Sequence, residues 1–175
     1  MPAPKNLIAA CCLSLLLSFP DSALAQRKWK DYLITGSSML VTGMLDGTVE
    51  SISFHYDNGF KPRFPHANDQ YWNPAISWEN KYKNGNQALG PAFTGSTSVF
   101  AWTTDAYHCL RTTARAMDVG TLAYYINHTT TEQISKRRKR MNMLCDFAVL
   151  TVIRSIGFSL TYNVLFNTQG KALKI

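Results

Sequence analysis

Three long apolar segments constrain this chain more than any other feature, because each is hydrophobic around most of its helical circumference and about long enough to cross a bilayer. They lie at about 33–55, 93–117 and 143–166. After the first 25 residues no stretch has roughly 18 uninterrupted apolar residues, and the mean hydropathy of −0.13 is low for a protein with several spans. We expect a mainly α fold, a small helical bundle embedded in a membrane, with a soluble or surface-bound bundle as the alternative.

The first 25 residues have the pattern of a secretory signal peptide. Lys5 lies in a short amino-terminal region, an apolar core runs over 7–19, and Ala23–Ala25 form a small-x-small cleavage site. The pattern predicts a signal peptide at 1–25 and a location in the membrane or cell envelope. Two alternatives stay open: cleavage at a lipoprotein-type box that ends at Cys11, and retention of the segment as an anchor.

The remaining residues, 26–175, have the length of a single domain with a real core. We therefore expect one helical domain after the signal peptide. Cys109 and Cys145 lie in two of the apolar segments. They either form one disulfide in an oxidising compartment or stay as packed thiols.

Part of the net charge of +7 is concentrated in Lys136–Arg140, five basic residues in a row. We expect them in a basic linker at 132–142, where they are solvated or face anionic lipid headgroups. With a signal peptide in front, nucleic acid is not an expected partner. Three spans after a cleaved signal would leave this run outside, against the positive-inside rule, whereas a fourth crossing near 116–131, which carries Asp118, would put it inside.

Residues 56–92 form a long segment rich in proline, glycine and asparagine, and we expect an irregular loop with one short helix near 76–82. Its aromatic content argues against disorder. Aromatic rings beside basic side chains are typical of contact with lipid headgroups or a protein partner, although they serve equally to cap a helical core. The candidate binding residues are Trp72, Trp78, Lys81, Tyr82 and Lys83.

Charged residues also interrupt the apolar segments. Asp105, His108 and Arg111 are spaced three apart, so a helix would place them close to one face. Charge in an apolar setting must reach water or be paired. The interpretation that we favour is a buried polar network that fixes helix register, with these members: Asp46, Glu50, Asp105, His108, Arg111 and Arg154.

Three chemical interpretations stay open beside that network: a metal site, acid–base chemistry, and a proton or ion path along buried Asp, His and Arg residues. Helix bundles that hold two metal ions use carboxylate-x-x-His pairs, and this chain has one such pair, so no cofactor is predicted and a divalent metal remains an alternative. Acid–base chemistry would use His108 oriented by Asp105 or Asp46, with Arg111 or Arg154 holding a phosphate or carboxylate group. The candidate metal ligands are Asp46, Glu50, His55, Asp105 and His108. Asp146 would be a further ligand that completes the set.

Gly43 and Gly47 are four residues apart, on one face of the expected first helix. In water each glycine would cost the helix up to about 1 kcal/mol. In lipid the same spacing permits close packing against another helix.

Several pieces of the sequence, taken as an ordered set, resemble an uncharacterised family of small helical membrane proteins from bacteria and phages. The pieces are Gly43–Glu50 with His55–Tyr56, Tyr71–Gly85, Thr104–His108 and Arg154–Leu160. The resemblance implies a membrane location and adds no reaction. The signal-like start and the basic run depart from the family pattern, which leaves the topology open.

These observations favour a small exported or integral membrane protein of structural or interaction type over an enzyme. Its expected partners are the lipid bilayer, including anionic headgroups, and a protein bound through 56–92. The alternative is a membrane-associated enzyme, acting on a lipid headgroup or with a metal, that uses Asp105 and His108 together with Asp46 and Glu50.

Overall fold

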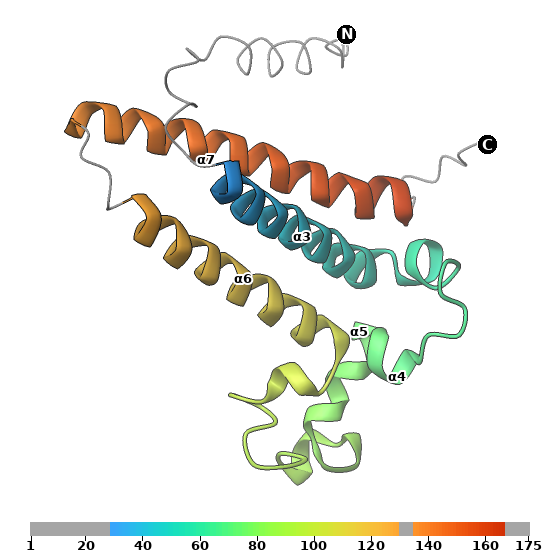
Figure 1. Ribbon diagram of the computed structural model, residues 1–175. Coiled ribbons are helices and arrows are strands. Elements are labelled where there is room, and N and C mark those ends of the chain that lie inside the picture. The colour runs from blue at the N-terminus through green and yellow to red at the C-terminus, as the bar shows by residue number, and fades with distance from the viewer. Residues whose placement is uncertain (1–28, 130–134, 167–175) are drawn as a thin grey trace, which may run out of the picture.

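The computed structural model describes residues 29–129 and 135–166, and the predicted signal peptide lies outside these residues. The described chain is mainly helical, as predicted (Figure 1). Its long helices are α3 (Trp29–Phe54), α6 (Ala106–Thr129) and α7 (Lys136–Ser159), and α7 continues as a π-helical turn over Leu160–Leu165.

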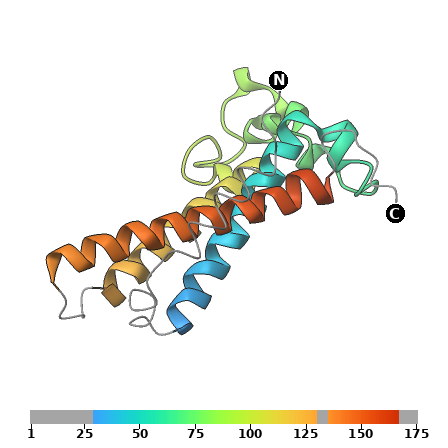
Figure 2. The ribbon, with the colours of Figure 1, turned by 90° about the horizontal axis from the view of Figure 1, so that it is seen from above.

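The central helix of the bundle is α3, which packs against α7 on one side and α6 on the other (Figure 1). Helices α3 and α7 run in the same direction and α6 runs in the opposite one. The segment between α3 and α6, residues 55–105, lies at one end of the bundle, and we call it the head. Figure 2 shows the start of α7 and the end of α6 at the other end. The basic run Lys136–Arg140 and the head are therefore at opposite ends.

The bundle buries small and polar side chains and exposes large apolar ones. Its buried polar residues come from all three long helices: Thr35, Thr42, Ser51, Thr121, Asp146 and Thr161. Large apolar residues on the outer surfaces are mostly exposed, for example Leu33 at 57%, Val119 at 67% and Phe147 at 71%. A helical bundle in water has the reverse distribution, because burial of large apolar side chains stabilises it.

Glycines line the contact between α3 and α7. A Cβ atom at Gly43 would lie 2.0 Å from the carbonyl oxygen of Arg154, and one at Gly47 would lie 2.7 Å from that of Phe158. From the opposite helix, a Cβ at Gly157 would lie 2.1 Å from the carbonyl oxygen of Leu40. The spacing of Gly43 and Gly47 thus serves close helix packing, as its sequence pattern indicated.

The head is built from short helical turns around an aromatic core. Phe60 stacks on Tyr56 and Trp72, and Phe166, directly after the π-helical turn that extends α7, packs against the same ring. The turns are Tyr56–Phe60, α4 (Asp69–Trp72), α5 (Pro74–Ser77), Trp78–Lys81, Lys83–Gly85, Gln87–Leu89 and Ala101–Thr103. The expected short helix near 76–82 is thus divided between the end of α5 and the turn that follows it.

The predicted second helix at 93–117 is misplaced, because α6 begins only at Ala106. Residues 93–104 form turns instead, and Gly95 has a φ of +84°, outside the helical range. At the other end, α6 continues to Thr129 without a break, since 119–126 extends the same helix. The suggested separate crossing near 116–131 is therefore wrong.

The basic linker predicted at 132–142 is also shorter than expected. Ser135 caps α7, accepting a hydrogen bond from the backbone N–H of Arg138 at 3.4 Å. The basic run Lys136–Arg140 consequently forms the first turns of α7. Of the long helices described, α7 with its π-helical extension, Lys136–Leu165, is long and apolar enough by itself to cross a membrane.

Candidate functional site

Arg154 of α7 joins the three long helices through two carboxylates. Its guanidinium donates to Asp46 of α3 at 2.7 and 3.0 Å and to Asp118 of α6 at 2.8 Å. All three side chains are about one-third exposed. Asp46 and Arg154, two members of the expected network, are therefore paired, and Asp118, which the sequence interpretation used only for topology, is the second partner of Arg154.

These residues form one wall of a cavity of about 320 Å³ between α3, α6 and α7. Arg111, Arg115 and Asp118 lie at helical positions i, i+4 and i+7, so α6 turns all three toward it. This spacing is the signal that would have identified Arg115 and Asp118. The cavity is lined by three arginines, three carboxylates and three apolar residues: Asp46, Val49, Glu50, Arg111, Ala114, Arg115, Asp118, Arg154 and Phe158.

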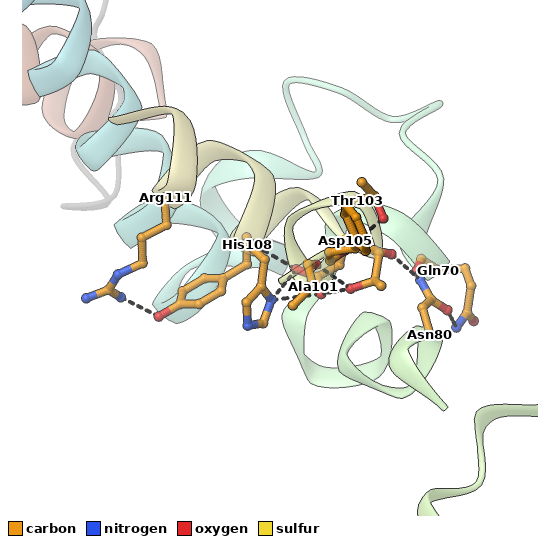
Figure 3. A network of polar contacts seen from close by, with 10 residues as sticks. Gln70, Asn80, Ala101, Thr103, Asp105, His108 and Arg111 are labelled. Atoms are coloured by element: carbon orange, nitrogen blue, oxygen red, sulfur yellow. Dashed lines mark hydrogen bonds and ion pairs between the residues drawn. The ribbon is translucent and has the colours of Figure 1, made fainter. Parts of the chain in front are cut away.

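Asp105 is the N-cap of α6 and does not lie within a helix. Its carboxylate, 1% exposed, accepts hydrogen bonds from the backbone N–H of His108 at 2.9 Å and from the Thr104 hydroxyl at 3.0 Å (Figure 3). The Nδ1 atom of His108 lies 2.8 Å from the same carboxylate. An ionised Asp105 accepts from Nδ1, which leaves Nε2 of a neutral His108 as an acceptor.

Arg111 is separate from this pair. Its guanidinium bonds the hydroxyl of Tyr107 and lies 5.4 Å from the centre of that ring (Figure 3). Neither Asp105 nor His108 lines the cavity that contains Arg111, Asp46 and Glu50. The six residues expected to form one network are thus divided between a helix cap and a charged cavity.

The remaining metal candidates are also apart. Asp146 accepts hydrogen bonds from Tyr32 at 3.2 Å and Tyr125 at 2.8 Å, and His55 Nε2 lies 2.9 Å from the hydroxyl oxygen of Tyr162. Within residues 29–129 and 135–166, no three His, Cys, Asp or Glu side chains are grouped as a metal ion would need. The metal alternative has no ligand cluster to support it in this part of the chain.

The expected binding residues of the head have different environments. Trp72 is half-buried, with its ring 5.1 Å from that of Phe60. Trp78 is 40% exposed and meets Tyr82 edge-on at 6.1 Å. Lys83 is exposed and Lys81 is half-buried. Trp72 therefore belongs to the core of the head, whereas Trp78 and Lys83 remain accessible to a partner.

The head also contains a polar cluster that sequence reasoning missed. Asp69 accepts a hydrogen bond from Tyr56 at 2.7 Å and forms an ion pair with Lys61. Burial and the Asp69 carboxylate raise the pKa of Tyr56, while Lys61 and Tyr56 lower the pKa of Asp69.

Cys109 of α6 and Cys145 of α7 are both free thiols, which excludes the disulfide in this structure.

The chain matches no protein-family model, and neither a curated protein nor a solved structure matches it. The functional argument therefore rests on the fold and on the charged cavity. Together they define a small helical-bundle protein with an apolar exterior and a polar interior.

Proposed function

We propose that the chain is a small integral membrane protein in which α3, α6 and α7 cross the bilayer and the head lies at one surface. The observation that carries the proposal is the inverted distribution of side chains, with glycine, serine and threonine inside and large apolar residues outside. Lipid leaves no hydrophobic driving force for burying large side chains, so close contact between small residues stabilises the bundle instead.

The helix lengths agree with this proposal. At 1.5 Å per residue, α3 is about 39 Å long and α6 and α7 are each about 36 Å long. The hydrocarbon core of a bilayer is about 30 Å thick. Arg154 between two carboxylates is the kind of paired charge that a membrane interior accepts, and the resemblance to small membrane proteins agrees as well.

The role that we propose for this protein is binding, with the accessible aromatic and basic residues of the head as the contact for a partner. Trp78 and Lys83 are the side chains to test first. A photo-crosslinking residue in place of Trp78 should capture a protein partner in the native membrane. The same residue at Lys30, in the first turn of α3 at the other end of the bundle, is the control and should not capture it.

Arginine substitutions on the exposed apolar surface test the membrane location. We expect Leu122→Arg and Phe147→Arg each to cost about 3 kcal/mol if these positions face lipid, and to be harmless if they face water. Val99→Arg in the head, where the native side chain is 74% exposed, is the matched control. The measurement is the fraction of folded protein in the membrane pellet after an alkaline carbonate wash, and full release of the unchanged chain would contradict the proposal.

Orientation is a separate question, because two sequence signals disagree. The positive-inside rule places Lys136–Arg140 in the cytoplasm and the head on the opposite side. A cleaved signal at 1–25 would place the head in the cytoplasm instead, because α3 would then enter from outside. We propose the orientation set by the basic run. A single cysteine at Ser98, in an otherwise cysteine-free chain, should then react with an impermeant thiol reagent on intact cells.

A further inference from the structure

We propose that the charged cavity and an apolar groove beside it form one binding site for a phospholipid. The phosphate lies at Arg111 and Arg115, and an acyl chain lies between α6 and α7. This inference rests on the membrane location proposed above, since it takes its ligand from the bilayer. Both spaces fall within the range of roughly 300–1,000 Å³ that is typical of ligand sites.

The groove lies between α6 and α7, which both pack on α3, and Met39 of α3 is among its lining residues. It encloses about 660 Å³, and Leu122 and Phe147 in its walls are 59% and 71% exposed. Along α7 it extends over 139–154, about 22 Å at 1.5 Å per residue. That length holds the acyl chain of one leaflet, which is half of a hydrocarbon core about 30 Å thick.

The groove and the charged cavity are adjacent and share two lining residues. Asp118 and Arg154 line both of them, so their ion pair lies where the apolar walls end and the charged walls begin. A phospholipid has the same arrangement, because its acyl chains join a charged headgroup through the glycerol. A free phosphate or a fatty acid would fill one of the two spaces and leave the other empty.

Two arginines in the cavity are available to a ligand. Arg154 is neutralised by Asp46 and Asp118, whereas Arg111 bonds the hydroxyl of Tyr107 and lies over its ring, with no ion-pair partner among the described residues. Arg115, one turn further along α6, is exposed and has no ion-pair partner among the described residues. Two guanidinium groups at i and i+4 provide the hydrogen-bond geometry that a phosphate diester accepts.

Glu50 distinguishes between headgroups. It lines the cavity from α3, whereas Arg111 and Arg115 line it from α6, and it likewise has no ion-pair partner among the described residues. Its carboxylate suits an ammonium group next to the phosphate. The three arginines and three carboxylates of the cavity together carry no net charge, which matches a zwitterionic headgroup such as phosphoethanolamine.

Native mass spectrometry of the full chain in mild detergent tests the site. Three ligands are titrated: dioleoylphosphatidylethanolamine, dioleoylphosphatidylglycerol, and glycerophosphoethanolamine, which has no acyl chains. We expect one tightly bound phosphatidylethanolamine, weaker phosphatidylglycerol, and no binding of the chain-free headgroup. Replacing Arg111 and Arg115 together by glutamine should weaken phosphatidylethanolamine binding about tenfold or more. Glu50→Gln should remove the preference between the two lipids.

Two matched controls keep the test specific. Arg137→Gln with Arg140→Gln removes the same charge from the exposed basic run and should leave the affinity unchanged. Leu144→Trp narrows the groove and should weaken binding, whereas Met141→Trp, outside the groove, should not. Equal loss in the controls, equal binding of the chain-free headgroup, or no bound lipid in the unchanged protein would overturn the inference. Retention in the membrane pellet is measured separately, so loss of the lipid site and loss of membrane insertion are distinguishable.

Discussion

Gly43 of α3 meets the main chain of Arg154 of α7 so closely that a Cβ atom on the glycine would lie 2.0 Å from the Arg154 carbonyl oxygen. The same Arg154 extends its side chain to Asp46 and Asp118. Close backbone contact and charge pairing therefore meet at one point of the bundle. The contact brings α7 near enough for its arginine to reach both neighbouring helices.

Gly43→Ala should destabilise the bundle by about 1–3 kcal/mol, because the added methyl group must push the two backbones apart. Gly120→Ala is the control, since a Cβ at Gly120 meets nothing within 4 Å. That variant should be neutral or up to about 1 kcal/mol more stable, owing to the helix propensity of alanine. The measurement is thermal unfolding in detergent, and equal effects of the two substitutions would contradict the packing interpretation.

Arg154 and Asp46 should show a coupling energy of about 1 kcal/mol in a double-mutant cycle with Arg154→Gln and Asp46→Asn. Both side chains are about one-third exposed, which keeps the value modest. Of the two single variants, Arg154→Gln should lower the free energy of unfolding more, because it leaves Asp46 and Asp118 without a cation between them. Additive effects on the free energy of unfolding would show that the ion pair contributes nothing.

The sequence predicted the helical class and marked two glycines as positions where a close helix contact is possible, because both follow from local patterns. Hydrophobic periodicity extends over whole helices, and Gly43 with Gly47 is a two-residue spacing. Helix ends were predicted less well. The second helix was expected to begin at 93, but it starts after Asp105, whose carboxylate caps it. Apolar composition does not distinguish the turns at 93–104 from helix, since the same side chains occur in both.

The candidate site was predicted in parts. Six charged residues were assigned to one network because their spacing places them on helix faces, but spacing along one helix does not fix which residues of another helix they meet. Glu50, Asp46, Arg111 and Arg154 do line one cavity, and Asp118 joins them. The Asp105 and His108 pair is local to the start of α6. Only the packing of α6 and α7 on α3 separates the two groups.

Asp69→Asn should destabilise the head near neutral pH and have little effect in strong acid. Lys61 and Tyr56 lower the pKa of Asp69 below its ordinary value of about 3.9. Its ionised form therefore stabilises the folded head above that value, and this contribution is lost as the pH falls through the lowered pKa. Tryptophan fluorescence during unfolding between about pH 2 and 7 measures the effect. Asp57→Asn, at an exposed carboxylate, should show no such pH-dependent difference from the unchanged chain.

Trp72→Ala should mainly lower the stability of the head, whereas Trp78→Ala should mainly weaken the capture of a partner. Trp72 stacks on Phe60 in the core of the head, so its loss should cost about 2 kcal/mol or more. Trp78 is 40% exposed, and its loss should change stability by less than about 1 kcal/mol while weakening partner capture. Unfolding of the head measures the first effect, and the yield of a photo-crosslinking residue placed at the exposed Lys83 measures the second. A Trp78→Ala head that unfolds as readily as the Trp72→Ala head would show that Trp78 is also structural.

Substitutions at Asp105 separate a capping role from a chemical one. Asp105→Asn keeps an oxygen that accepts the backbone N–H of His108, whereas Asp105→Ala removes it and should cost about 1 kcal/mol. Because asparagine and aspartate are nearly equal as N-caps, the asparagine variant should unfold at almost the same temperature as the unchanged chain. His108→Gln removes the imidazole but keeps the cap, so it should be nearly as stable. If capping is the role of Asp105, partner capture and lipid binding should follow stability in all three variants. Loss of either binding in the Asp105→Asn and His108→Gln variants, with the fold intact, would instead assign the pair a direct part in function.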